Sequence, residues 1–367
     1  MPPTLLHIFP SFGVGGQQTR FATIANRLGQ SYRHRVISLE GADEAVSLID
    51  PGIDFALIRV PGEARSLSGQ LWWMSRLIGS LEPDILITYN WGAIEWAMFN
   101  RLFARRKHIH LEDGFGPDEA DQQKRRRVIT RRLMLRRSTV VVPSRTLRNI
   151  AVGQWRLKAE RVIYIPNGID SARFDRPSTK EAKPFSSSAQ RDGECVIGTF
   201  SPLRPEKNIG RMLRAFAEIR VPSRRLVVCG DGPELPKLRE IAKRLALEEV
   251  VTFAGHVQKP EEIMGAFDLF AITSDTEQMP YAVLEAMSAR LPVVGTAVGD
   301  IPIMVAEENR PYIVPRDSHA ALAAALQRLC VDVGLRRKLG VANRSRVDRD
   351  FGLAQMTKAF SRLLQAS

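Results

Sequence analysis

The sequence predicts an α/β protein with two domains, each built on a parallel β-sheet covered by helices. Short apolar runs alternate with longer helical stretches along the chain, and this alternation is typical of parallel sheets that are buried on both faces. The segment 176–194 interrupts the alternation, because it is polar, rich in Ser and Pro, and without apolar periodicity. We therefore expect a first domain over 1–175, a linker over 176–194 and a second domain over 195–350.

Seven apolar runs are the expected strands of the first domain. They are Leu5–Phe9, Val36–Leu39, Phe55–Val60, Ile85–Tyr89, His108–Leu111, Thr139–Val142 and Val162–Ile165. A glycine-containing loop follows the first run and leads into a helix over 17–28. In this loop Gly15 and Gly16 allow close backbone approach, and their N–H groups can hold a phosphate at the start of the helix. The loop lacks the final glycine of the G-x-G-x-x-G dinucleotide motif.

Further apolar runs are the expected strands of the second domain. They are Val196–Phe200, Arg225–Cys229, Val250–Phe253, Leu269–Thr273, Pro292–Gly295 and Tyr312–Val314. A helical tail follows from about 353 to 364.

Two carboxylates, Glu277 and Glu285, follow the run 269–273 and stand eight positions apart. Glu277 lies in the loop after the expected strand, and Glu285 lies about one turn into a helix over 282–289. Pro280 or Tyr281 suits the first turn of that helix. Both carboxylates are thus expected at the carboxyl edge of a sheet, where open α/β folds bind ligands, and can accept hydrogen bonds from sugar or ribose hydroxyls. Taken alone, this spacing also fits an ordinary surface loop.

Two cations, Arg204 and Lys207, follow the first expected strand of the second domain. At the carboxyl end of a strand they can neutralise a diphosphate, whose charge grows as it leaves with a nucleotide. An isolated turn of this composition is more often only solvated.

The stretch SDTEQMPYAVLEAMSARLPVVGTAVGDIPIMV (274–305) resembles the donor-binding motif of the retaining glycosyltransferases of family 4. The segments 162–174, 200–216 and 227–257 match the family in type and order. The resemblance implies the GT-B architecture, in which two Rossmann-like domains face each other across a cleft. It also implies that the last helix, about 351–367, returns to the first domain.

The resemblance further implies roles for individual residues. Glu277 would bond the transferred sugar, Glu285 the ribose, Arg204 and Lys207 the diphosphate, and Gly16 the diphosphate from the first domain. Pro280 stands where the family often has Gly and lacks an N–H to donate. Any backbone contact to the donor is therefore expected from neighbours such as Gln278, Met279 or Tyr281.

An acid pair, Glu112 and Asp113, follows the strand 108–111, at the place where many family members carry a His. Asp113 can orient an acceptor hydroxyl or take its proton. The alternative is a pair that caps a helix or stabilises the loop. His108 and His110 alternate with apolar residues and are expected to be structural, while Trp91 can line an acceptor groove or pack in the core.

The net charge is +13 and the pI about 10.1, which favours a polyanionic partner. The segment 122–137 contains eight Lys or Arg and no acid. The residues expected to contact an anionic membrane or the acceptor are Lys124, Arg125, Arg126, Arg127, Arg131 and Arg132. A solvated helix is the simpler alternative. Nucleic-acid binding is another, although no aromatic stacking platform accompanies the charge.

The remaining composition predicts a reducing compartment and no metal. Cys195, Cys229 and Cys330 are widely spaced and are expected to be buried free thiols. No His, Cys, Asp or Glu cluster has metal-ligand spacing, and no export signal or membrane-spanning run occurs in the sequence. We expect a cytoplasmic protein.

Together with these observations, the resemblance implies a retaining, metal-independent glycosyltransferase without a cofactor. Its donor would be a UDP- or GDP-type nucleotide sugar, and its acceptor a lipid-linked glycan or oligosaccharide in polysaccharide biosynthesis, reached from the inner face of the cytoplasmic membrane. The alternatives are a non-catalytic sugar-nucleotide or polysaccharide-binding protein and a nucleic-acid-binding protein. The sequence specifies neither base, sugar and linkage nor oligomeric state.

Overall fold

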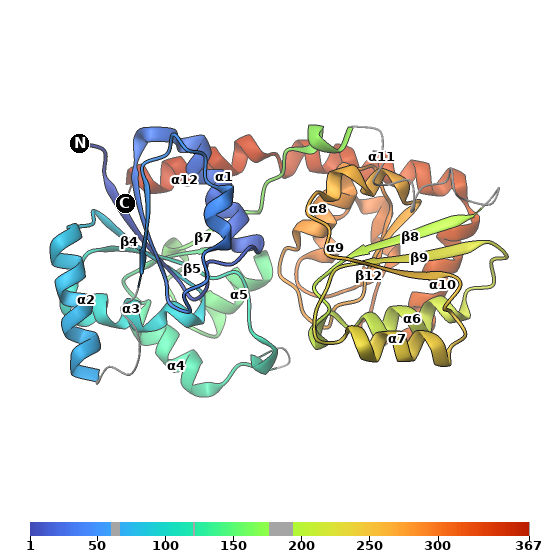
Figure 1. Cartoon of the computed structure of the whole chain (residues 1–367), viewed down its shortest axis with the longest axis horizontal. Coiled ribbons are helices and arrows are strands. Elements are labelled where there is room, and N and C mark those ends of the chain that lie inside the picture. Colours follow the sequence, from blue (N-terminus) through green and yellow to red (C-terminus); the bar gives the residue numbers. More distant parts are fainter. Residues whose placement is uncertain (60–66, 120–121, 176–193, 367) are drawn as a thin grey trace. The chain divides into compact units, whose positions relative to one another are not determined.

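A computed structural model describes residues 1–59, 67–119, 122–175 and 194–366, and the chain forms two compact units. The first unit contains the chain up to Asn167 together with the residues from Ala354 onward, and the second unit spans Gly168–Leu353. Residues 176–193 of the expected linker, Val60 at the end of an expected strand, and Ser367 lie outside the described residues. The chain therefore passes from the first unit to the second and then returns (Figure 1).

The first unit is built on a seven-stranded parallel sheet with the order β3-β2-β1-β4-β5-β6-β7. The strands are β1 (Thr4–Phe9), β2 (Arg33–Ser38), β3 (Phe55–Arg59), β4 (Ile85–Tyr89), β5 (Lys107–Leu111), β6 (Thr139–Val142) and β7 (Val162–Tyr164). Chain order reverses between β1 and β4, so the loops after these two strands meet at the carboxyl edge. That switch point is where open α/β sheets bind ligands.

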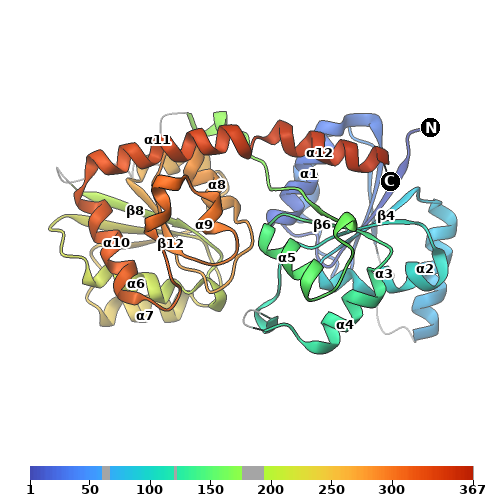
Figure 2. The ribbon, with the colours of Figure 1, turned by 180° about the vertical axis from the view of Figure 1, so that it is seen from behind.

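Helices cover both faces of the first sheet. They are α1 (Gly16–Leu28), α2 (Leu67–Leu81), α3 (Ile94–Phe99), α4 (Arg125–Met134), α5 (Arg145–Gly153) and α12 (Leu353–Ala366). Helices α1 and α12 lie on one face, and α2, α3 and α4 lie on the other (Figures 1 and 2). Apolar side chains at helical spacing, Phe21 and Ile24 from α1 and Phe360 and Leu364 from α12, enclose a cavity of about 30 Å³ against the strands.

The second unit is built on a six-stranded parallel sheet with the order β10-β9-β8-β11-β12-β13. The strands are β8 (Cys195–Phe200), β9 (Arg224–Cys229), β10 (Val251–Gly255), β11 (Leu269–Ile272), β12 (Val293–Thr296) and β13 (Ile313–Val314). The switch point lies between β8 and β11. The loops that carry Arg204, Lys207 and Glu277 therefore follow the two strands that flank it.

Helices on the two faces of the second sheet form separate apolar cores. They are α6 (Ile209–Glu218), α7 (Leu235–Arg244), α8 (Tyr281–Ser288), α9 (Ile301–Met304), α10 (His319–Val331) and α11 (Val333–Asp350). The core under α6, α7 and α10 contains Leu213, Leu238 and Leu326. The core under α8, α9 and α11 contains Leu284 and Val347. Among the described helices, none combines the length and apolar composition needed to cross a membrane.

Residues 168–175 differ from the expected domain boundary at 175, because they pack with the second unit. Phe174 lies in the core under α8. Ile169 donates a backbone hydrogen bond to Phe351 at 2.9 Å and accepts one from Leu353 at 3.0 Å. The outgoing and returning chains are thus bonded side by side, a long-range pairing that composition does not reveal.

Candidate active site

The loop after β8 carries both predicted cations and is held by the loop after β9. Leu203 donates a backbone hydrogen bond to Asp231 at 2.8 Å. Gly230 and Gly232 have φ of +145° and +156°, and a Cβ at Gly230 would lie 1.9 Å from the Ser201 carbonyl oxygen. Only glycine permits such an approach together with a positive φ. The glycines of the CGDG stretch therefore serve to support the cation-bearing loop.

Lys207 and Glu277 meet across the switch point. The Lys207 Nζ lies 2.5 Å from the Glu277 Oε1, and the two side chains are 20% and 11% exposed. The Arg204 side chain is exposed and has no ion-pair partner in the part of the chain that the structure describes. The structure thus brings together Lys207 and Glu277, which are 70 positions apart in the sequence, and Arg204 lies on the same loop as Lys207. An unpaired cation and a lysine beside a carboxylate form a site with both anion- and hydroxyl-binding capacity.

The loop that holds Glu277 is fixed by neighbours on both sides. Ser274 donates a hydroxyl hydrogen bond to Glu277 Oε1 at 2.7 Å. Gly299, in the loop after β12, has φ of +54°, and a Cβ there would lie 2.1 Å from the Glu277 carbonyl oxygen. Asp300 donates its backbone N–H to the Gln278 carbonyl at 2.9 Å. The Gly-rich loop after β12 therefore packs directly on the Glu277 loop.

A further ion pair stabilises the same edge of the sheet. Arg211 on α6 pairs with Asp275 at 2.8 Å, and its guanidinium also donates to the Thr273 carbonyl at 2.8 Å. Asn208 caps α6 through Arg211 N–H and donates to Asp275 at 3.1 Å. The sequence analysis did not single out these residues, although Asn208 immediately before a helix is a recognisable N-cap.

Glu285 lies on α8, as predicted, and is only partly exposed. The pKa of Glu285 is raised to about 7, chiefly by burial and also by nearby Glu261, while Arg173 opposes the shift. Arg173 forms an ion pair with Glu261. A carboxyl group accepts hydrogen bonds from hydroxyl groups through both oxygens once it has lost its proton.

The predicted neighbours of Glu277 lie at the start of α8. Pro280 is the N-cap residue and Tyr281 the first residue of the helix. The Met279 side chain is 5% exposed and packs in the core under α8. Met279 can therefore contact a ligand through its backbone only.

In the first unit, Gly15 and Gly16 lie at the carboxyl edge next to the switch point. Gly15 is the N-cap of α1 in an extended conformation, with φ −164° and ψ 172°, and Gly16 begins the helix. The first turn contains no acidic residue. The positive end of the helix dipole is therefore not neutralised by the residues of the first turn themselves.

Asp113 lies in the loop after β5 and is bonded to α1. Its carboxylate pairs with Arg20 at 2.6 Å and accepts a hydrogen bond from Gln17 at 2.6 Å. Its backbone N–H donates to the Asn90 side chain at 2.7 Å. The Asp113 side chain is still 18% exposed. Sequence analysis missed Gln17, Arg20 and Asn90, because they come from other elements of the sheet edge.

Glu112, in contrast, is fully buried and turned away from solvent. Its Oε2 lies 3.2 Å from Arg131 Nε and 3.6 Å from His110 Nε2. His110 and His108 both contact the Thr88 hydroxyl inside the sheet, at 2.8 and 2.9 Å. The expected structural role of the two histidines is confirmed, and of the acid pair only Asp113 can reach a ligand.

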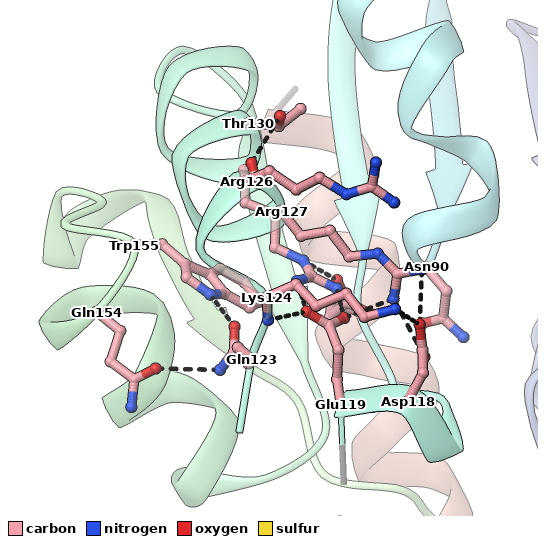
Figure 3. A network of polar contacts seen from close by, with 12 residues as sticks. Asn90, Asp118, Glu119, Gln123, Lys124, Arg126, Arg127, Thr130, Gln154 and Trp155 are labelled. Carbon is pink, nitrogen blue, oxygen red and sulfur yellow. Dashed lines mark hydrogen bonds and ion pairs between the residues drawn. The ribbon is translucent and has the colours of Figure 1, made fainter. Parts of the chain in front are cut away.

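The basic segment 122–137 is not one exposed surface. Arg131 is buried between Glu112, Glu119 and aromatic rings, so its prediction as a membrane or acceptor contact is wrong. Arg127 is 15% exposed and pairs with Asp118 and Glu119, and Lys124 pairs with Asp118 at 2.6 Å (Figure 3). The predicted arginines that remain exposed without a described ion pair are Arg125, Arg126 and Arg132.

These three arginines surround exposed apolar side chains on α4. Ile129 and Leu133 are 56% and 51% exposed. They stand four positions apart and so lie on one side of the helix. The outer face of α4 therefore combines positive charge with apolar surface.

Two further predictions concern the cysteines and Trp91. Cys195, Cys229 and Cys330 are buried free thiols, as expected. Trp91 is partly buried, with the Arg127 guanidinium 5.0 Å from its ring centroid. Within the described ranges, no group of three His, Cys, Asp or Glu side chains is arranged to hold a metal ion.

The two Rossmann-like units place the chain in the GT-B class of α/β proteins. The family described as "Glycosyltransferase Family 4" matches residues 14–173, and that described as "Glycosyl transferases group 1" matches residues 181–346. Together these matches cover most of the chain, which belongs to glycosyltransferase family 4.

Individual proteins resemble the chain over different lengths. The alpha-monoglucosyldiacylglycerol synthase of Streptococcus pneumoniae is 34% identical over 42% of this chain and 36% of its own length. The D-inositol 3-phosphate glycosyltransferase of Corynebacterium jeikeium is 26% identical over 79% of this chain and 70% of its own. The first of these relatives is thus matched over only about a third of its length.

Among solved structures, the Anabaena protein HepE in complex with UDP and glucose has a TM-score of 0.84 and 19% identity, and all of both chains is covered. This likeness confirms the predicted fold class.

Proposed function

We propose that this chain is a retaining, metal-independent glycosyltransferase that uses a nucleoside diphosphate sugar. The observation that carries the proposal is the contact of Lys207 with Glu277 at the β8–β11 switch point, beside the exposed Arg204. A diphosphate requires cations and a sugar requires hydroxyl acceptors, and this edge of the sheet supplies both. The crystal structure of HepE with UDP and glucose, and the family membership, support the same substrate class.

Each group has a defined task in the proposed donor complex. Arg204 and Lys207 bind the diphosphate, Glu277 accepts a hydrogen bond from the transferred sugar, and Glu285 accepts one from the ribose. The N-terminus of α8 adds a positive dipole at the same edge. In the first unit, Gly15 and Gly16 at the start of α1 present backbone N–H groups that suit phosphate oxygens.

The reaction breaks the bond between the anomeric carbon and the diphosphate oxygen, and both electrons of that bond leave with the diphosphate. The acceptor hydroxyl forms its bond to the anomeric carbon on the same face. Its proton passes to the departing phosphate, so no enzymic base is consumed. Arg204 and Lys207 stabilise the charge that develops on the diphosphate. Asp113 orients the acceptor hydroxyl, and its pairing with Arg20 fits this role better than proton removal.

We further propose that the acceptor is a lipid-linked glycan and that the protein acts at the inner face of the cytoplasmic membrane. The support comes from α4, where Arg125, Arg126 and Arg132 surround the exposed Ile129 and Leu133. Basic and apolar side chains on one face suit an anionic lipid surface. The name of the pneumococcal relative also refers to a glycolipid product.

The enzymatic proposal is tested with a panel of UDP- and GDP-sugars. Thermal shift identifies the donor, and release of the nucleoside diphosphate in the presence of water or acceptor shows catalysis. Proton NMR of the first product formed then gives the anomeric configuration. If nucleotide sugars bind without release of nucleoside diphosphate, the chain is a binding protein. An inverted product rules out the retaining mechanism.

The membrane proposal is tested by co-sedimentation with vesicles containing phosphatidylglycerol. Three arginines near the surface contribute about 3 kcal/mol, so replacing Arg125, Arg126 and Arg132 by Gln should weaken binding about 100-fold. The matched control replaces three exposed basic residues of α7, Arg239, Lys243 and Arg244. Equal binding of both variants, or no binding of the wild type, contradicts a membrane role for α4.

A further inference from the structure

We propose that Arg131 is the positioning residue of the loop 112–119 and thereby holds Asp113 in place for the acceptor. This inference rests on the proposed transferase function, in which Asp113 orients the acceptor hydroxyl. The Arg131 side chain is 1% exposed and cannot itself contact a substrate. It acts through the residues that it binds.

Arg131 connects the two ends of this loop. Its Nε donates to Glu112 at 3.2 Å, where the loop begins. Its two terminal nitrogens donate to the Glu119 carboxylate at 3.4 and 3.3 Å, where the described part of the loop ends. A planar guanidinium presents its donors in a fixed geometry, so both carboxylates are held at a set distance from each other.

Three aromatic rings fix the guanidinium in turn. Its central carbon lies 5.0 Å from the ring centroids of Trp91 and Trp155 and 5.3 Å from that of Phe115. Phe115 belongs to the middle of the same loop. Arg131 thus contacts the beginning, the middle and the end of the loop. Desolvated cation–π contacts of this kind favour one position of the side chain.

Arg131 contacts the sequence neighbours of both Asp113 and Asn90. Asp113 follows Glu112 directly in sequence, and its N–H donates to Asn90 at 2.7 Å. Asn90 in turn precedes Trp91, whose ring packs on the Arg131 guanidinium. Glu112 and Trp91, which adjoin Asp113 and Asn90 in the sequence, are therefore both in contact with the Arg131 side chain. A shift of this guanidinium would move the backbone at Asp113 and Asn90, because Arg20 and Gln17 hold only the Asp113 carboxylate.

The negative and positive charges of this network balance one another within the protein. Arg127 donates to Glu119 at 3.0 Å (Figure 3). Glu112 and Glu119 therefore face two guanidinium groups, those of Arg127 and Arg131. Glu119 also accepts the backbone N–H of Lys124 at 3.0 Å, just before α4 begins. Buried ion pairs contribute little net stability, because desolvation offsets the attraction. Such a network is better explained by the geometry that it imposes than by the stability that it adds.

The test compares two conservative variants. Arg131→Lys keeps the charge, but a single ammonium cannot bridge both carboxylates as the guanidinium fork does. Arg136→Lys makes the same chemical change just after α4, where the side chain is exposed. Arg131→Met would leave two buried carboxylates without this partner and is expected to misfold, so Glu119→Gln serves as the second variant.

Two readouts separate positioning from general destabilisation. The first is transfer from UDP-glucose to a polyprenyl-diphosphate-linked monosaccharide in micelles, measured beside hydrolysis of the same donor by water. Arg131→Lys should lower kcat for transfer about 100-fold, the cost of misplacing a reacting group by about 1 Å. Donor KM and hydrolysis should stay within about threefold, because the donor side chains Arg204, Lys207 and Glu277 lie in the other unit.

The second readout is amide hydrogen exchange and needs no acceptor. In Arg131→Lys and Glu119→Gln, exchange over 112–119 should become at least tenfold faster, while β5 and β6 keep their protection. Arg136→Lys should change neither readout. Equal losses of transfer and hydrolysis, or unchanged exchange over 112–119, would overturn the proposal. If the wild type neither transfers nor hydrolyses any nucleotide sugar, the proposed function fails, and hydrogen exchange still decides whether Arg131 holds the loop.

Discussion

Replacing Glu277 by Gln should strengthen the binding of a bare nucleoside diphosphate while it prevents sugar transfer. The reason is that Glu277 lies 2.5 Å from the cation that the diphosphate requires. The carboxylate therefore lowers the positive potential at the phosphate site of the free protein. A glutamine keeps the size and one oxygen of the side chain but removes this charge.

The magnitude follows from the geometry of Lys207. A phosphate oxygen bonded to the Nζ would lie about 4 Å from the Glu277 oxygen on the other side of the ammonium. At this separation two negative charges repel by about 1 kcal/mol in water and by about 4 kcal/mol at the effective dielectric constant of a protein surface. Because the Lys207 and Glu277 side chains are 20% and 11% exposed, we take a repulsion energy between these two limits. After allowance for a less well oriented lysine, we expect about 1.4 kcal/mol, or tenfold tighter binding.

Isothermal titration calorimetry with UDP at low and high salt measures this effect. Asp317→Asn removes a charge from the loop after β13, where the side chain is 87% exposed, and serves as the charge control. We expect Glu277→Gln to bind UDP about tenfold more tightly, with the advantage reduced at high salt because exposed charges are screened. The same variant should lose transfer by at least about 100-fold, since the amide cannot replace a charged acceptor at the sugar.

Weaker or unchanged UDP binding in Glu277→Gln would refute this reasoning. It would mean that the carboxylate helps the lysine reach the diphosphate rather than competing with it. Tighter binding in the Asp317 control as well would show that only the net charge matters. Retained transfer would show that Glu277 does not bind the sugar.

Three further predictions follow from the same edge of the sheet. Arg204→Ala and Lys207→Ala should each lower turnover about 100-fold with unchanged melting temperature, and near-normal turnover in both would contradict the diphosphate role. Glu285→Gln should weaken nucleotide binding. Above pH 7 it should also raise the free energy of unfolding by about 2 kcal/mol, with no gain near pH 4. The reason is that the pKa of Glu285 is about 7 in the folded protein and 4.5 by reference, so ionisation of this carboxyl destabilises the fold only as pH rises between these values. Turnover should persist in EDTA, and a loss that Mg²⁺ or Mn²⁺ restores would show that the two cations do not suffice.

The strands were predictable because parallel strands are buried on both faces and so appear as continuous apolar runs. The runs at 85–89 and 139–142 coincide with β4 and β6, and most others differ by one or two residues at an end. The helix that holds Glu285 begins at Tyr281, where Pro280 favoured a start. The sequence did not predict that residues 168–175 belong to the second unit, because this depends on backbone hydrogen bonds between Ile169 and the distant residues Phe351 and Leu353.

The donor side of the site was predictable for a topological reason. Arg204, Lys207 and Glu277 follow strands of one parallel sheet, and the carboxyl ends of such strands share an edge. Local pattern was enough to place them there. The contact between Lys207 and Glu277 was not predicted, because it requires that β8 and β11 be neighbours, and strand order is not encoded in local periodicity.

The acceptor side shows where local patterns fail. Arg131 and Arg132 are adjacent residues of the same type, yet one is buried and the other exposed. The difference comes from Glu112 and Glu119 and from three aromatic rings, contributed by segments elsewhere in the sequence. A signal was nevertheless present in the sequence. The acid Glu119 precedes the basic segment 122–137, and the aromatic Trp155 follows it. Burial of an arginine requires such partners.

Helix α12 has a consequence for the order in which the protein forms during synthesis. It follows the whole second unit in the chain, although it belongs to the first. The second unit is continuous in sequence and can form as soon as residue 353 has left the ribosome. Until α12 follows, the apolar surface around Leu5 and Ile24 lacks Phe360 and Leu364, which cover it in the complete protein. The first unit is therefore synthesised first but completed last. A chain interrupted after Phe351 exposes an apolar surface that can aggregate with other nascent chains.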